Sequence, residues 1–365
     1  MDRFERLKLL LTTRGFEAVV LTKPANIAAF FRGAQLSLGF RQEPPGRIAI
    51  CMTREKVVLL GNRTEVSRVA EDELSWLHGL TGRPFRWDEW HLKASVKVYL
   101  DSEGIKRVCD DIGAFGENIG TALEVMYYPL SDEEIKNIRE LAKDTASIVE
   151  SEAKNLDSGP TEVRVAGELA GQLVSRSIWP ELIMVAADER IGRFRHCVPK
   201  DIPIRRLALL SVTVHRRGVY VSLTRLVSLG AATPEWRQLQ EACNRVDATA
   251  ILLSKPGTSV GEIFSAMKRS YAEEGYPDEW AAHHQGGPAG FYGRDYKATE
   301  HESRSLVERQ PIVWNPTVCG AKSEDTILTG RMGQIPEIIT ETGTWVYYDA
   351  SFNGVTIRRP TILEK

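Results

Sequence analysis

Three of the seven histidines and one Glu-Asp pair lie in three short stretches of this 365-residue sequence. The stretches are 193–199, which contains His196, 283–290, which opens on two adjacent histidines, and 322–326, which contains Glu324. An imidazole is the side chain best suited to transfer a proton near neutral pH. A buried carboxylate beside arginine stays ionised, and it can bind a cationic group or orient a histidine. These residue types therefore indicate acid–base chemistry.

Two other kinds of chemistry are disfavoured. The glycine-rich run 286–290 is not followed by the Gly-Lys-Ser/Thr of a phosphate-binding loop, and it is typical of a tight turn with positive φ. Cys197 and Cys319 lie near the same stretches but have no evident activating triad, so we expect inert thiols. The five cysteines are scattered and form no CxxC pair, which favours reduced thiols in a cytoplasmic protein.

The charge balance narrows the choice of partners. Lys and Arg number 47 and Asp and Glu number 49, which gives a formal charge of −2. This balance argues against a strongly basic nucleic-acid-binding protein. No apolar run approaches the roughly 18 residues of a membrane span, and the first residues are too charged for a signal peptide. We therefore expect neither a nucleic-acid nor a membrane partner.

The patterning predicts two domains. Up to about residue 125, helix and strand alternate, with a helix at 2–15, a turn at 23–26, and strands at 17–22, 47–52, 56–60 and 95–100. Ser131 and Glu134 form a capping box for a long helix that ends near 156, and Thr161 caps a second helix to about 177. Strands follow at 206–214, 219–224, 311–314 and 343–348, with helices at 234–254 and 260–274. We predict an α/β domain over 1–128 and an α+β domain over 129–365.

Several of these segments resemble one family. Residues 6–27 resemble the opening of the creatinase/prolidase N-terminal domain, and 131–139 resemble the helix that begins its catalytic domain. Residues 218–230, 314–316 and 322–326 resemble the family's strand pair and its E-P-G and I-E-D-T segments. The resemblance covers nearly the whole chain in the right order. It implies a creatinase-like N-terminal domain, a pita-bread C-terminal domain as in aminopeptidase P and prolidase, and a homodimer.

The resemblance also locates the family's metal ligands. Its peptidases bind two divalent metals through two Asp, one His and two Glu, and the matching positions here are Ser211, Ser222, Gly287, Asn315 and Glu324. Only Glu324 keeps a metal-binding group, and one carboxylate cannot offset the repulsion between two cations. We therefore predict that the dinuclear metal centre is lost and that no cofactor replaces it.

Other polar residues match the family's pocket. His196 and His283 resemble its substrate-side histidines, so we take them, with Glu324, as candidate catalytic residues. The candidate substrate contacts are Arg294, Arg225, Asn315, Tyr292 and His284. Structural roles remain open as alternatives: a salt bridge for Arg225, a carboxylate pair for Glu324 and Asp325, and core packing for the histidines.

Two functions fit these residues. The first is a metal-independent hydrolase that cleaves a C–N bond in a small amino-acid-like or peptide-like compound, as creatinase does without a metal on a similar scaffold. The second is a catalytically inactive pseudo-peptidase that binds a small ligand or a protein. A proline-specific metallopeptidase fails on the ligand count. We favour the hydrolase, because Ser, Ser and Asn at the former ligand positions indicate a remodelled polar pocket.

Overall fold

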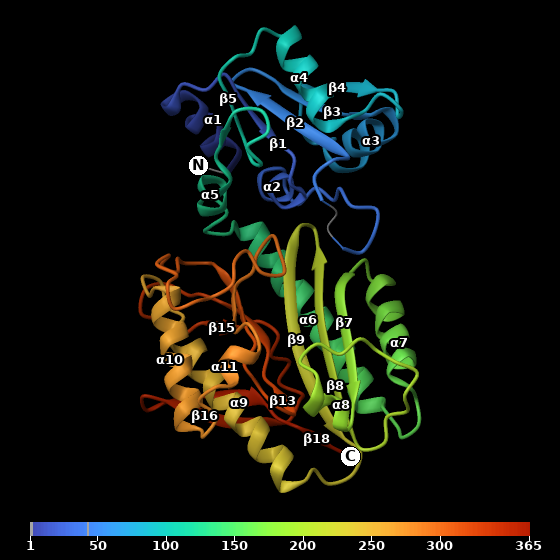
Figure 1. Ribbon diagram of the computed structural model, residues 1–365, viewed down its shortest axis with the longest axis vertical. Helices are drawn as coiled ribbons and strands as arrows, with labels where there is room; N and C mark the ends of the chain where they lie inside the picture. The colour runs from blue at the N-terminus through green and yellow to red at the C-terminus, as the bar shows by residue number, and fades with distance from the viewer. Residues whose placement is uncertain (1–2, 42–43) are drawn as a thin grey trace. The chain divides into compact units, whose positions relative to one another are not determined.

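The computed structural model describes residues 3–41 and 44–365 and divides the chain into two compact units, Met1–Tyr127 and Tyr128–Lys365 (Figure 1). Within the described residues, no helix combines the length and apolarity that crossing a membrane requires. The candidate site residues all belong to the second unit.

The first unit is built on a six-stranded sheet with the order β4-β3-β2-β1-β5-β6. Its strands are β1 (Ala18–Leu21), β2 (Ile48–Thr53), β3 (Val57–Asn62), β4 (Leu80–Phe85), β5 (Val108–Asp110) and β6 (Glu117–Asn118). Strand β2 runs antiparallel to both of its neighbours, and the other pairs are parallel. The helices are α1 (Arg3–Arg14), α2 (Pro24–Phe30), α3 (Arg63–Arg68), the π-helix η1 (Val69–Glu73), α4 (Leu92–Ser102) and α5 (Gly120–Val125).

Two sequence-based predictions in this unit are wrong. The segment 95–100 is part of helix α4 and not a strand. Val96 and Leu100 are buried one turn apart while Val98 is 60% exposed, so the apolar spacing that suggested a strand serves a helix face. The expected turn at 23–26 leads directly into α2, whose first residue is Pro24; the fixed φ of proline suits the first helical turn.

The second unit has two four-stranded sheets. One has the order β18-β9-β8-β7 and consists of β7 (Trp179–Ala187), β8 (Leu207–Arg216), β9 (Val219–Ser228) and β18 (Leu363–Glu364). The other has the order β10-β11-β14-β15 and consists of β10 (Gly286–Pro288), β11 (Pro311–Trp314), β14 (Asp325–Leu328) and β15 (Glu337–Ile338). Two small hairpins pair β12 (Thr317–Val318) with β13 (Ala321–Lys322) and β16 (Tyr347–Phe352) with β17 (Val355–Pro360).

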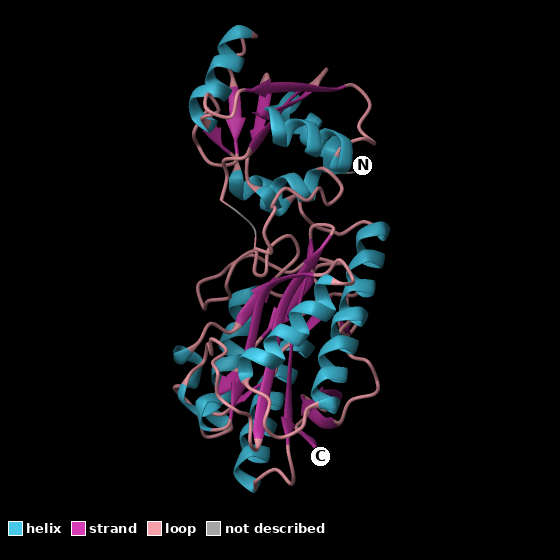
Figure 2. Cartoon of the chain, turned by 90° about the vertical axis from the view of Figure 1, so that its right-hand side faces the viewer, coloured by secondary structure: helices cyan, strands magenta, loops and turns pink. Residues whose placement is uncertain are grey.

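Helices lie along these sheets, as Figure 2 shows. They are α6 (Asp132–Asn155), α7 (Glu162–Val174), α8 (Glu189–Arg193), α9 (Pro234–Leu253), α10 (Val260–Glu273) and α11 (Glu279–Ala282). Helix α6 packs against β9, and α7 packs against β7. Helices α9 and α10 pack together, and their apolar faces meet Trp314 of β11 in a buried core cluster. This packing holds β9 and the second sheet in place around the candidate residues.

Most predicted elements of this unit are confirmed. The capping box of Ser131 and Glu134 is present at the start of α6, and Thr161 caps α7 through the backbone N–H of Arg164. The strand predicted at 343–348 is displaced: β16 begins at Tyr347. Gly343 has a φ of +75°, which belongs to a turn and not to a strand.

Candidate functional site

Four hydroxyl side chains cover one face of the β8–β9 pair. The antiparallel register sets Ser211 opposite Thr224 and Thr213 opposite Ser222. Because side chains alternate along a strand, all four lie on the same face. Thr224 donates a hydrogen bond to Ser211 over 2.9 Å, and Thr213 and Ser222 share one of the same length. We call these four residues the hydroxyl quartet; it contains both former aspartate positions.

Glu324 is buried against this quartet and carries four protein partners. Its Oε2 accepts hydrogen bonds from Thr224 over 2.7 Å and Ser211 over 3.1 Å, and it lies 2.8 Å from Nζ of Lys322. Its Oε1 accepts a hydrogen bond of 2.9 Å from Nη2 of Arg294. Burial alone would raise the pKa of Glu324, but Lys322 and Arg294 lower it to about 2. The carboxylate is therefore ionised at neutral pH and already neutralised by protein cations.

Gly287 has no room for a side chain. Its φ is +143°, and an added Cβ would lie 2.5 Å from the carbonyl oxygen of Tyr296. The position that the resemblance assigns to the family's histidine ligand therefore excludes any metal-binding side chain in this backbone conformation. The positive φ expected in this run is present at Gly286 and Gly287, but the tight turn expected there is wrong for 286–288, because Gly286–Pro288 form strand β10 and pair with β11.

These groups do not fit a dinuclear metal centre. Serine, serine, glycine and asparagine occupy four of the five ligand positions, and the fifth, Glu324, already holds Lys322 and Arg294. A divalent cation placed at Glu324 would meet two positive side chains at short range. The donor set therefore disfavours the family's metal chemistry at this position.

His196, His283 and His284 lie together beside Glu324 and Lys322. The Nε2 atoms of His196 and His283 are 2.9 Å apart, and the rings of His283 and His284 are 4.4 Å apart between centroids. Burial lowers the pKa of His196, and burial followed by the charge of Lys322 lowers the pKa of His283 to about 2. Burial and Arg294 lower the pKa of His284 to about 3. At neutral pH the rings are neutral, so they are available as proton acceptors.

Arg294 reaches Glu324 from a loop that Asp295 organises. One oxygen of Asp295 accepts hydrogen bonds of 3.3 Å from the backbone N–H groups of Gly290, Phe291 and Tyr292, and the other accepts one from the Tyr128 hydroxyl. Arg294 also contacts Ser222 over 3.3 Å, and its Nε is buried with no hydrogen-bond partner within the described part of the chain. One donor of the guanidinium group thus lacks an acceptor within the described part of the chain.

Asn315 lies one residue beyond the register pair of Trp314 and Asp325, next to the position of Glu324. It is 3% exposed, and its backbone N–H donates to the carbonyl of Gln285 over 3.2 Å. Its side-chain oxygen has no hydrogen-bond partner among residues 3–41 and 44–365. A buried amide oxygen without a protein donor is a candidate ligand contact.

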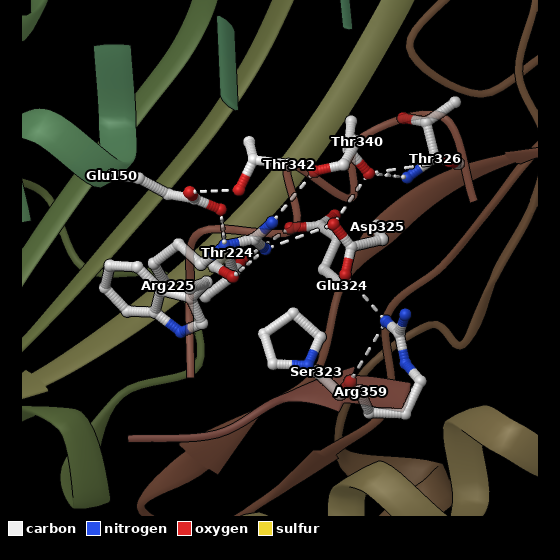
Figure 3. A network of polar contacts seen from close by, with 12 residues as sticks. Glu150, Thr224, Arg225, Ser323, Glu324, Asp325, Thr326, Thr340, Thr342 and Arg359 are labelled. Atoms are coloured by element: carbon white, nitrogen blue, oxygen red, sulfur yellow. Dashed lines mark hydrogen bonds and ion pairs between the residues drawn. The ribbon is translucent and has the colours of Figure 1, made fainter. Parts of the chain in front are cut away.

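Arg225 belongs to a different network, which Figure 3 shows. Its guanidinium is 1% exposed and donates to Glu150 over 3.0 Å and to Asp325 over 3.1 Å, and also to the carbonyls of Thr224 and Thr340. Asp325 in turn accepts a hydrogen bond of 2.8 Å from Arg359. These contacts favour the structural salt bridge that the sequence left open for Arg225 over a substrate contact.

Comparison with known proteins identifies the family of this chain. A family model described as metallopeptidase family M24 matches residues 136–331, which is more than half of the sequence. This chain belongs to metallopeptidase family M24. An uncharacterized peptidase of Staphylococcus aureus strain MW2 is 23% identical over 366 residues, which cover 93% of this chain and 99% of the relative.

Solved structures confirm the fold of this M24 member. The prolidase of Pyrococcus horikoshii OT3 superposes with a TM-score of 0.76 at 18% identity, over 93% of this chain and 98% of that chain. The X-Pro aminopeptidase of Thermotoga maritima MSB8 gives a TM-score of 0.74 at 16% identity, over 93% and 98%. The predicted creatinase/prolidase resemblance and pita-bread architecture are thus confirmed. Family and fold together support a hydrolase of the peptidase type.

Sequence reasoning missed three contributors to the site of this M24 member. Lys322 was treated only as the start of a motif, although its ammonium group lies on Glu324. Thr213 and Thr224 complete the hydroxyl quartet. The two-residue periodicity of β8 and β9 was a signal for both threonines, because Thr213 follows Ser211 and Thr224 follows Ser222 at that spacing. Lys322 stands two residues before Glu324, so the same spacing was a signal for this ion pair as well.

Proposed function

We propose that this M24 member is a hydrolase that cleaves a C–N bond in a small amino-acid-like or peptide-like compound without a dinuclear metal centre. The observation that carries the proposal is the state of Glu324. Its carboxylate is occupied by Lys322 and Arg294 at 2.8 and 2.9 Å, where the family resemblance expects a metal ligand. Chemistry at this site then rests on imidazole and on fixed side-chain charges.

The charges of the site favour an anionic substrate. Lys322 and Arg294 contact the carboxylate of Glu324, and the charge of Asp295 also acts on Arg294, so two cations and two carboxylates lie together. The exposed Lys297 is a third cation, whose charge lowers the pKa of both His196 and His284, and it leaves one unit of positive charge. A substrate carboxylate matches the unpartnered Nε edge of Arg294. The buried oxygen of Asn315 supplies an acceptor for an N–H group of the same molecule.

His196 is the base in this proposal. It is neutral and exposed, and its Nε2 contacts the Nε2 of the buried His283, which positions the ring. Water adds its oxygen to the carbon of the C–N bond while His196 accepts the proton. The C–N bond then breaks, and the proton passes to the departing nitrogen. A general base of this kind contributes about 10²- to 10⁴-fold to the rate.

The setting of the enzyme is part of the proposal. All five cysteines are free and four of them are buried, which supports a reducing, cytoplasmic environment. The family resemblance supports a homodimer. Sedimentation equilibrium of the full chain tests this assembly: we expect twice the chain mass of 40.8 kDa, and a monomer at micromolar concentration contradicts it.

The decisive experiment is turnover after chelation. The full-length protein is treated with EDTA, checked by elemental analysis, and assayed against N-carbamoyl, N-amidino and Xaa-Pro derivatives of amino acids, with release of the amine or ammonia as the readout. We expect turnover of a carboxylate-bearing compound to survive chelation. Loss of turnover on chelation, with recovery only when Mn²⁺ or Co²⁺ is added, contradicts the proposal.

Variants then test the base. His196→Gln should lower kcat by about 10²-fold or more with KM little changed, because the imidazole acts on water and not on substrate binding. His301→Gln is the matched control, since His301 is 88% exposed and lies outside the cluster. Unchanged kcat in both His196→Gln and His283→Gln removes the imidazoles from the mechanism.

A further inference from the structure

The three clustered histidines have a geometry of their own. His196 follows α8, and His283 and His284 follow α11 directly. One ring nitrogen from each lies within 4.8 Å of the other two. Two segments almost 90 residues apart in the sequence thus bring three imidazoles to one point. We call these residues the histidine trio.

Three imidazoles and an open fourth position form a familiar donor set for zinc. Tetrahedral coordination with Zn–N bonds of about 2.0–2.1 Å separates ligand nitrogens by about 3.3 Å. The Nε2 atoms of His196 and His283 are 2.9 Å apart, and the ligand nitrogens of the whole trio lie within 4.8 Å of one another. Coordination therefore requires the rings to turn so that the widest separation closes by up to about 1.5 Å, to the roughly 3.3 Å of a tetrahedral site.

A second observation points to a ligand at the same place. His283 is 8% exposed, and none of the described residues forms a hydrogen bond with its Nδ1. Its Nε2 meets another imidazole nitrogen, so only one of the two facing atoms can donate a proton. An ion between the two Nε2 atoms replaces the proton that they share and binds both lone pairs. Each ring then holds its proton on Nδ1, which in His283 has no acceptor among the described residues, and this lowers the affinity of the site.

The neighbouring charges set the strength and selectivity of such a site. Lys322 and Lys297 are close enough to lower the pKa of trio members, and they oppose a cation, whereas Glu324 favours one. Nitrogen-only donors prefer Zn²⁺, Co²⁺, Ni²⁺ or Cu²⁺ to Mg²⁺ or Ca²⁺. We expect one transition-metal ion with a Kd on the order of micromolar, weaker than structural zinc sites.

We propose that His196, His283 and His284 bind a single transition-metal ion, at a site that uses none of the five ligand positions implied by the family resemblance. The ion takes one nitrogen from each ring and leaves a fourth position open. In the proposed hydrolysis, the lone pair of His196 accepts a proton from water. A metal ion bound to His196 occupies that lone pair, so the metal-bound enzyme is inactive. This effect on activity rests on the proposed function.

Direct binding tests the site without reference to activity. Tag-free, chelator-treated full-length protein is titrated with Co²⁺, with visible absorption reporting coordination, and with Zn²⁺ by calorimetry. We expect one ion per chain. His196→Gln and His284→Gln should each weaken binding at least tenfold while circular dichroism and the Tm stay close to the parent. His301→Gln, which removes a histidine outside the trio, should leave binding unchanged.

Lys297→Gln should change metal affinity in the opposite direction, toward tighter binding. This residue is exposed, so its replacement should not disturb folding, and removal of its charge should tighten binding by a few-fold. Absent binding, or binding that survives both His196→Gln and His284→Gln, overturns the inference. Two ions per chain, lost in Glu324→Gln, would instead indicate a site of the family type.

The activity readout keeps the two proposals separate. Zinc inhibition of a chelator-resistant activity supports both. Zinc binding to the trio in a protein whose turnover requires zinc supports the site and contradicts metal-independent hydrolysis. Turnover that survives chelation, with no metal bound at the trio, supports the hydrolase and overturns the site.

Discussion

Glu324 and Asp325 are neighbours in the sequence and both are buried, yet their surroundings differ in charge. Asp325 bonds to Arg225 and Arg359, and Arg225 also holds Glu150 (Figure 3). Arg359 holds Asp247 as well, so three carboxylates share two guanidinium groups. Glu324 alone faces two cations, Lys322 and Arg294. Alternation along the strand sends the two side chains to opposite faces.

This difference in charge distinguishes a structural network around Asp325 from a candidate binding site around Glu324. The Asp325 network is acidic, wholly buried and spans α6, β9, α9, β14 and β17, so its ion pairs join the layers of the unit. The Glu324 cluster has a positive excess and lies beside an exposed histidine. Among the described residues, the nearby amide oxygen of Asn315 and the Nε of Arg294 have no hydrogen-bond partner. A surplus of buried positive charge is relieved by an anion from outside, which is the behaviour of a binding site.

The largest effect should come from Arg225→Met. It leaves Glu150 and Asp325 buried without their guanidinium, and breaking a buried pair in this way lowers the free energy of unfolding by about 3–5 kcal/mol. Arg294→Met should cost less, about 1–3 kcal/mol, because Glu324 keeps Lys322 and two hydroxyl donors. Urea denaturation measures both.

For substrate binding, the order of the two arginine variants should be reversed. Arg294→Met should raise KM for a carboxylate-bearing substrate, while any Arg225→Met protein that folds should bind it as the parent does. For stability, the baseline is Lys136→Met, which removes an exposed ion pair with Glu140 and should change the free energy of unfolding by less than about 0.5 kcal/mol. Equal stability losses in the two arginine variants would erase the distinction between framework and site.

Gly287→Ala tests whether the Glu324 side can become a metal centre again. The added Cβ meets the carbonyl of Tyr296 at 2.5 Å, and the backbone is at positive φ, so we expect a loss of about 2–5 kcal/mol. Gly275→Ala is the matched control: its φ is +89° and nothing lies within 4 Å, so only the backbone strain of about 1–2 kcal/mol remains. Similar losses in both variants would show that the pocket has room for a ligand side chain.

The sequence predicted those features that local patterns encode. The capping box of Ser131 and Glu134 and the cap of α7 by Thr161 depend on residues a few positions apart, and both are present. The family resemblance added the architecture. Local periodicity failed at 95–100, where alternating valines fit a strand and a helix face equally well.

The partners of charged groups could not be predicted in the same way. Arg225 and Glu150 are 75 residues apart, and Arg294 and Glu324 are 30 apart, so only the packed sheets decide which cation meets which carboxylate. The roles of His196, His283, Glu324, Arg294, Asn315, Tyr292 and His284 in binding or catalysis stay predictions. The structure adds distances and charges to them, and the variants above test them.

The Asp295 carboxyl group should make the stability of the fold depend on pH. Burial raises its pKa from 3.8 to about 6, despite bonds from the loop N–H groups and from Tyr128. A raised folded-state pKa stabilises the fold below the unfolded pKa near 3.9 and loses this effect as pH rises through about 6. Because each pKa unit corresponds to 1.36 kcal/mol, the loss is at most about 3 kcal/mol between pH 4 and pH 7.

Asp295→Asn isolates this contribution, since it cannot titrate. The stability of the variant relative to the parent should improve as pH increases from 4 to 7, in urea denaturation at matched ionic strength. A constant difference between the two proteins over this range would show that Asp295 keeps an ordinary pKa. In that case Asp295 would not make the stability of the loop that carries Arg294 depend on pH over this range.

The smallest effect among the site variants should come from Thr213→Val in the hydroxyl quartet, where one face of a strand pair offers an internal comparison. Thr224 donates to the charged Glu324, so Thr224→Val should cost about 1.5–3 kcal/mol, whereas Thr213 meets only the hydroxyl of Ser222 and Thr213→Val should cost about 0.5–1.5 kcal/mol. The shapes are nearly the same, so the difference measures the carboxylate. Equal losses of unfolding free energy in the two variants would mean that Lys322 and Arg294 satisfy Glu324 without the hydroxyls. The ionised state of Glu324 would then depend on the two cations alone.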